Sequence, residues 1–200
     1  MSVRSSLLAI LTMGPAYGFQ LHGELRTRTA GRRSVNVGQV YATLDRLTGQ
    51  GAIESAGTTD DGLPLYRLTP AGRLEAGAWL AATSSGAGDE WPDMVDRILI
   101  ASSLPHTDPT VLVNAYREHW LSVLTDTAPA SDATGQERLN MAATSAQAAA
   151  ALAWLDAVTD LLAGPDGDRP DAPAAASGFR RPFSAVRPKR GRRPAASGGG

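Results

Sequence analysis

Apolar residues recur at helical spacing in four stretches of the first 83 residues. Between the third and fourth stretches, two shorter runs with a turn signal at Asp61-Gly62 are typical of a β-hairpin. The expected elements are helices over 7–13, 17–29, 36–50 and 70–83 and strands over 52–57 and 63–69. The order of elements is therefore three helices, a two-stranded hairpin and a fourth helix.

Residues that favour helix ends support these boundaries. Asn36, followed three positions later by Gln39, is typical of a capping box, and Gly51 supplies a C-terminal stop. Thr69 and Pro70 fit the cap and first turn of the fourth helix. This order of elements predicts a winged helix-turn-helix.

Beyond a Ser-, Gly- and Ala-rich linker, three more helices are expected over 91–104, 108–128 and 136–163, the second of them capped by Asp108. The last would be about 40 Å long at roughly 1.5 Å per residue, more than a domain of its size covers, so a second copy of the chain is expected to pack on it. Pro, Gly, Ala and Arg dominate from Gly164 onward, which predicts disorder. The fold class is thus mainly α with a small β-hairpin wing, and the predicted domains are a winged helix-turn-helix (1–83), a helical dimerisation domain (90–163) and a disordered basic tail (164–200).

Charge is segregated along the chain, although the total is only −1. The net charge is +2 over 1–80, −9 over 81–170 and +6 over 171–200. The acidic middle disfavours nucleic acid as its partner, whereas both ends remain eligible, and the tail is expected either to add salt-sensitive DNA affinity or to be merely solvated.

The residue patterns of metal sites, common enzyme sites and cofactor sites do not occur in the sequence. There is no cysteine, and the three histidines have no ligand-like spacing, so no metal site is expected. No phosphate loop, nucleophile elbow or dinucleotide fingerprint occurs, so neither an enzyme nor a cofactor is expected. No run reaches the roughly 18 apolar residues of a membrane span, which predicts a cytoplasmic protein without a membrane partner.

The helix over 36–50 has one short polar face. On a helical wheel an arc of roughly 100° carries Gln39, Ala42, Thr43, Arg46 and Gln50, opposite an apolar set around Val40, Leu44 and Leu47. Small residues let a backbone approach base edges in a major groove, while Gln and Arg bond them bidentately. The alternative is an ordinary solvated face, but the surrounding order of elements favours a recognition helix.

Residues 3–80 resemble the DNA-binding domain of the PadR family of bacterial transcriptional regulators. The motifs LLAILTMGPAYGFQL, VGQVYATLDRLTGQGAIES and YRLTPAGR carry the likeness, and the remainder is similar to the longer PadR subgroup with dimerising C-terminal helices. The resemblance implies a homodimer that binds double-stranded DNA and represses transcription. The chain has Ala42 where the family usually has Pro, and Asp60 and Asp61 at a wing tip where relatives tend to carry cations.

The resemblance also implies site residues. Gln39, Thr43 and Arg46 would face the groove, and Tyr41 would contact a phosphate or instead pack on the hairpin. Tyr17 and Gly18 open the second helix, where an amide can meet a phosphate, although packing is the favoured role for Tyr17. In the hairpin, Arg67 is the only cation and so the only candidate there for a DNA contact.

Four tryptophans, Trp79, Trp91, Trp120 and Trp154, lie near the domain junction and along the expected dimer helices. Core and interface anchoring is one role for them. The other is a pocket for a small aromatic or hydrophobic effector, since PadR relatives respond to phenolic acids or drugs. Two rival functions stay open: a winged-helix interaction module that docks a protein through its acidic surface without binding DNA, and a ligand-sequestering helical protein.

Overall fold

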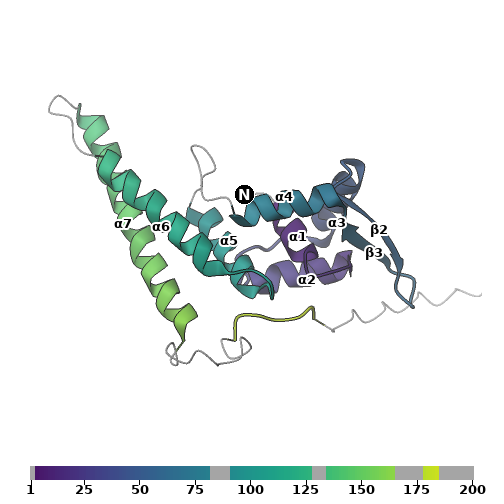
Figure 1. The fold of residues 1–200 in the computed structure, drawn as a ribbon. Coiled ribbons are helices and arrows are strands. Elements are labelled where there is room, and N and C mark those ends of the chain that lie inside the picture. The colour runs from purple at the N-terminus through teal and green to yellow at the C-terminus, as the bar shows by residue number, and fades with distance from the viewer. Residues whose placement is uncertain (1–2, 82–90, 128–133, 165–177, 185–200) are drawn as a thin grey trace, which may run out of the picture.

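The computed structural model describes residues 3–81, 91–127, 134–164 and 178–184 and shows a mainly helical chain with one small sheet (Figure 1). The helices are α1 (Val3–Leu11), α2 (Gly18–Arg28), α3 (Val37–Gly49), α4 (Pro70–Ala81), α5 (Trp91–Ser103), α6 (Pro109–Asp126) and α7 (Gly135–Ala163). The strands are β1 (Ala16–Tyr17), β2 (Ile53–Thr58) and β3 (Pro64–Leu68). The predicted fold class and the order of the main elements are confirmed.

Helix α1 is the centre of the first core. Each residue of 7–11 is at most 2% exposed, and α1 contacts α2, α3, α4, α5 and β3. The apolar run near the N-terminus therefore forms the helix around which the winged-helix unit is packed, and removing its surface from water supplies much of the driving force for that packing.

The sheet has one more strand than expected. Its order is β1-β3-β2, with all neighbours antiparallel, and Ala16 pairs with Tyr66 while Ile53 pairs with Leu68. The sequence predicted only the hairpin of β2 and β3, because a two-residue strand is too short to show an alternating pattern. This added strand ties the start of α2 to the wing.

The predicted helix starts are present. The Thr69 hydroxyl accepts a hydrogen bond from Gly72 N (3.1 Å) at the start of α4, and Asp108 caps α6 ahead of Pro109. A Cβ at Gly72 would lie 1.9 Å from the Ala52 carbonyl oxygen, so only glycine lets α4 approach the beginning of β2 this closely.

Helix α5 belongs to two cores. Ile100 and Leu104, just beyond its end, pack in the first core, whereas Met94, Ile98 and Ala101 pack against α6 and α7. The predicted linker over 83–89 lies outside the described residues. In the described part of the chain, α5 joins the winged-helix unit to the helical unit.

Helices α6 and α7 run side by side away from the winged-helix unit (Figure 1). Arg117 of α6 pairs with Asp156 of α7 (Nη2 to Oδ1, 2.7 Å). On α7 the buried residues include Ala148, Ala151 and Leu155, while Leu161 is 64% exposed. Alanine at the contact lets the two backbones approach, and the remaining apolar surface of α7 is uncovered in the single chain.

Helix α7 also differs from one expectation. An 18-residue window of it reaches a mean hydropathy of 1.2 with 17% of the window buried, so by length and composition alone it is able to cross a membrane, whereas the sequence predicted no such segment. A soluble core helix can pass the same test.

Part of the expected disordered tail has a defined place. Residues 178–184 run across α2 and the end of α5, with Phe183 packed against the first core. Composition indicated disorder because Pro, Gly and Arg bury little apolar surface, but this segment is held mainly through its main chain. The other tail residues, 165–177 and 185–200, lie outside the described residues.

Candidate nucleic-acid interface

Both ends of α3 are fixed as its sequence predicts. Asn36 Oδ1 accepts a hydrogen bond from Gln39 N (2.7 Å), which is one half of the expected capping box. Gly51 follows the helix with φ +70°, a conformation that favours glycine, and Ala52 N donates to Leu47 O (3.0 Å) across it. The helix therefore presents a defined face rather than a frayed one.

That face is polar and most of its side chains are short, as expected. Its exposed residues are not the same set as those of the predicted arc. Its exposed positions include Gly38, Gln39, Ala42, Asp45, Arg46 and Gly49, and its buried positions are Val40, Thr43, Leu44 and Leu47. Two glycines and one alanine leave the backbone open along the middle of the face. Such a surface can approach another backbone or a groove closely.

Arg46 and Asp45 share this surface. The guanidinium of Arg46 lies back along the helix, with Nε donating to Ala42 O (3.0 Å). Asp45 is exposed beside it, although the helical wheel did not single it out. The spacing of Gly38, Ala42 and Asp45 at i, i+4 and i+7 was the available signal, since it places all three on one stripe.

The prediction that Thr43 faces outward is wrong. Thr43 is only 6% exposed, and its hydroxyl donates to the Gln39 carbonyl one turn earlier (2.8 Å). A threonine at the edge of a polar arc can be buried in this way because its single donor finds a partner on its own helix. Thr43 is therefore a core residue of α3.

Tyr41 packs across the start of α2. A Cβ at Gly18 would lie 2.6 Å from Cε1 of the Tyr41 ring, and Tyr41 is half-buried against the first core. Tyr17, the residue before Gly18, is 6% exposed. In the structure Tyr17 is thus buried and Tyr41 packs against the first core. Their implied phosphate contacts stay predictions.

Tyr66 on β3 adjoins the same region. Burial raises the pKa of the Tyr66 hydroxyl above its ordinary value, and the negative charge of Asp45 and the neighbouring Tyr41 add to that effect. The hydroxyl therefore stays protonated, and able to donate, to a higher pH than an exposed tyrosine.

The wing offers little positive charge. Arg67 donates from Nε to Glu54 Oε1 (2.8 Å) across the β2–β3 pair. At the tip, Asp60 and Asp61 are exposed, and Asp61 accepts a hydrogen bond from the Thr59 hydroxyl (2.6 Å). Arg67 is thus already paired, and the carboxylates at the tip would repel a phosphate backbone.

The cations of the loop between α2 and α3 also form ion pairs. Arg32 and Arg33 both pair with Asp96, which is 1% exposed, and Arg33 Nη2 lies 3.0 Å from Asp93 Oδ1. These pairs fasten the loop before α3 to α5. The loop therefore serves the junction between the two units rather than offering free cations.

The four tryptophans do not share one contact. Trp91 and Trp154 meet edge to face with ring centroids 5.4 Å apart, and Trp120 Nε1 lies 3.2 Å from Met94 Sδ. Trp79 lies under the guanidinium of Arg97, 5.2 Å from its ring centroid. Each ring thus contacts a neighbouring side chain within the protein. The expected effector pocket stays a prediction.

One comparison with known proteins covers most of the winged-helix unit. Residues 7–78 match the model of the transcriptional regulator PadR-like family. No curated protein matches the chain.

Three solved structures are among those that match part of the chain. A transcriptional regulator from Clostridium thermocellum is 25% identical, covering 38% of this chain and 73% of that one, with a TM-score of 0.36. PadR of Bacillus subtilis with operator DNA is 20% identical, covering 78% and 96%, with a TM-score of 0.39. The same protein with p-coumaric acid is 20% identical, covering 78% and 95%, with a TM-score of 0.37. Over residues 7–78, the chain is thus similar to the transcriptional regulator PadR-like family.

Proposed function

We propose that the protein is a cytoplasmic, homodimeric DNA-binding transcriptional repressor whose α3 enters the major groove. The observation that carries this proposal is the exposed face of α3 within a PadR-like domain, where Ala42 lies between Gln39 and Arg46 and the glycines at 38 and 49 lie just outside them. Gln39 and Arg46 are the proposed base-contacting residues, because an amide and a guanidinium can each bond a base edge through two atoms.

The described cations predict few phosphate contacts. Arg32, Arg33 and Arg67 are held in ion pairs, and the wing tip is acidic. A main-chain amide at Gly18 and the Tyr41 hydroxyl are the remaining proposed phosphate contacts from the motif. DNA affinity should therefore fall less steeply with salt than it does for a highly basic winged helix.

Dimerisation is proposed through α6 and α7. Leu139 and Leu161 on α7 and Leu121 on α6 are 72%, 64% and 50% exposed in the single chain. An obligate dimer buries about 2,000 Å² or more of largely apolar surface, which these helices would supply. The paired recognition helices would then meet successive major grooves about 34 Å apart.

An effector is proposed to act at the junction of the two units. The rings of Trp79 and Tyr116 flank Arg97 between α4, α5 and α6. Because Tyr116 and Arg97 are buried, a flat hydrophobic ligand would reach these rings by displacing the guanidinium. Bacillus subtilis PadR has been crystallised with p-coumaric acid, a ligand of that chemical class. A ligand that shifted α5 would move the winged-helix unit relative to α6 and α7.

A protein-interaction module without DNA binding is the second candidate. The exposed Asp60 and Asp61 and the paired state of Arg67 favour it. Titration of labelled DNA from upstream of the protein's own gene, at several salt concentrations, separates the two. Saturable binding that weakens with salt and gives a two-half-site footprint supports the repressor, whereas no binding at low salt supports the interaction module.

A further inference from the structure

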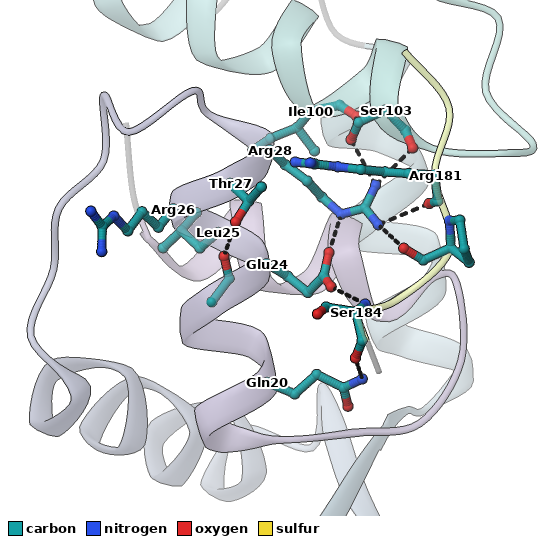
Figure 2. Close-up of polar contacts among 12 residues, drawn as sticks. Gln20, Glu24, Leu25, Arg26, Thr27, Arg28, Ile100, Ser103, Arg181 and Ser184 are labelled. Carbon is teal, nitrogen blue, oxygen red and sulfur yellow. Dashed lines mark hydrogen bonds and ion pairs between the residues drawn. The ribbon is translucent and has the colours of Figure 1, made fainter. Parts of the chain in front are cut away.

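The last residue of α2, Arg28, is the meeting point of three distant segments (Figure 2). Its side chain is fully buried, and its guanidinium has five N–H donors to satisfy. Nε donates to Glu24 (2.8 Å), and Nη1 donates to the carbonyl and hydroxyl oxygens of Ser103 (2.7 and 2.9 Å). Nη2 donates to the carbonyls of Arg181 and Pro182 (3.0 and 3.3 Å). Five acceptors thus match five donors.

The C-terminal segment supplies hydrogen-bond partners to both members of the buried Glu24–Arg28 pair. Besides the two carbonyls on Arg28, it supplies Ser184 N, which donates to Glu24 Oε1. Burial lowers the pKa of Arg28, and the adjacent Glu24 carboxylate opposes that effect. A buried ion pair needs its remaining donors and acceptors satisfied, and without residues 178–184 one guanidinium nitrogen and one carboxylate oxygen would lose these partners.

The segment is bound mainly through its main chain. Gln20 Nε2 donates to Ser184 O (3.1 Å), and Arg181 N donates to Ser103 O (3.3 Å). Among its described side chains, Phe183 packs against the first core. Gln20 and Glu24 belong to α2 and Ser103 to α5, so the segment touches the winged-helix unit and the helix that joins it to α6 and α7.

We propose that residues 178–184 are a strap that locks α2 to α5 and thereby sets the position of the winged-helix unit relative to α6 and α7. The strap occupies a site that recognises an extended peptide through the Glu24–Arg28 pair. The consequence for DNA rests on the proposed function: a docked strap holds the two recognition helices of a dimer at one spacing, and release makes that spacing variable. Affinity for two half-sites then falls because ordering the units costs entropy on binding.

Two full-chain variants test the docking. Ser184→Pro removes the N–H that donates to Glu24, whereas Ser184→Ala retains it. Trypsin cleavage after Arg180, followed by mass spectrometry, measures access to the peptide bond whose nitrogen, Arg181 N, bonds Ser103 O. Cleavage should be several times faster in Ser184→Pro than in Ser184→Ala and the wild type. Equal rates in all three chains would overturn the strap, provided circular dichroism shows the same helix content.

A DNA experiment tests the consequence separately. Binding is compared on upstream DNA containing two half-sites and on a single half-site, with a chain ending at Ser184 as the control that keeps the strap and removes the cations beyond it. Ser184→Pro should lose about fivefold or more on two half-sites and nothing on one, a range typical of coupling between sites. An equal loss on both DNAs, or no loss on either, would overturn the coupling. Absence of DNA binding by every chain would refute the proposed function, while the trypsin comparison would still decide on the strap.

Discussion

Tyr41 of α3 lies across Gly18 of α2 so closely that a Cβ at Gly18 would be 2.6 Å from Cε1 and 2.7 Å from Cζ of the ring. Real Cβ atoms essentially never approach another heavy atom this closely. The missing side chain at Gly18 therefore leaves room for the Tyr41 ring of α3 against the start of α2. This contact is one of those that hold α3 against α2.

Gly18→Ala should lower the free energy of unfolding by about 1–3 kcal/mol, because the added methyl forces the ring or the helix to move. Gly23→Ala is the matched control, since Gly23 lies on the same helix and a Cβ there would meet no heavy atom within 4 Å. Alanine at position 23 should stabilise the protein by about 0.4–1 kcal/mol through helix propensity and lower chain entropy. Urea denaturation measures both, and equal effects at the two positions would contradict the close contact between Gly18 and Tyr41.

Arg28→Ala should cost about 3–5 kcal/mol, because it leaves the Glu24 carboxylate buried without its cation. The comparison is Arg67→Ala, which breaks the Glu54–Arg67 pair on the wing, where both side chains are about half exposed. An exposed pair contributes about 0–1 kcal/mol. Thermal unfolding of the two variants separates the cases, and a small loss for Arg28→Ala would show that the pair is solvated.

Stability should fall at alkaline pH partly through Tyr66. Its pKa in the folded protein is raised above the ordinary value of 10.0 by burial first and by the charge of Asp45 second. The folded state therefore holds the tyrosine proton more tightly than the unfolded state does. The resulting stability is fully present below pH 10 or so and is lost as pH rises from there through the folded pKa.

Tyr66→Phe should flatten that alkaline fall, and Asp45→Asn should lower the pKa of Tyr66 while leaving the ring in place. Ultraviolet titration of tyrosinate, together with denaturation at a series of alkaline pH values, measures the two effects. The same alkaline slope in the wild type and in Tyr66→Phe would rule out Tyr66 as the source.

Leu161→Lys should turn a dimer into a monomer in sedimentation velocity, because a charge placed in an apolar interface must be desolvated without a partner. Leu74→Lys is the control: Leu74 is 77% exposed, but it lies on α4 of the winged-helix unit rather than on the proposed dimer helices. A wild-type chain that sediments as a monomer would contradict the proposed assembly. So would a dimer that both variants leave intact.

Local signals in the sequence predicted most of the fold. Asn36, Thr69 and Asp108 act through atoms within a few residues of themselves, so their capping roles were visible without tertiary structure. The wing was predicted for the same reason, from two short strands around a turn containing Gly62. Strand β1 was missed, since its partner Tyr66 is distant in sequence.

The candidate site was less predictable. A helical wheel places Thr43 only to within an arc, and packing of α3 on its neighbours decided that it is buried. Glu24 and Arg28 have the i, i+4 spacing of an ordinary surface pair, but their burial depends on a segment more than 150 residues later in the chain. Likewise, the partners of Arg32 and Arg33 lie on α5, which no local pattern could reveal.

The central claim is that α3 distinguishes base pairs through Arg46. Its most direct test is the ratio of affinities for upstream operator DNA and for the same DNA with single base pairs replaced, measured for the wild type and for Arg46→Ala at one salt concentration. Arg46→Ala should lose about 1–3 kcal/mol on the operator and lose discrimination at one position in each half-site. If the variant kept every ratio of the wild type, Arg46 would not contact a base and the proposed role of the α3 face would be contradicted.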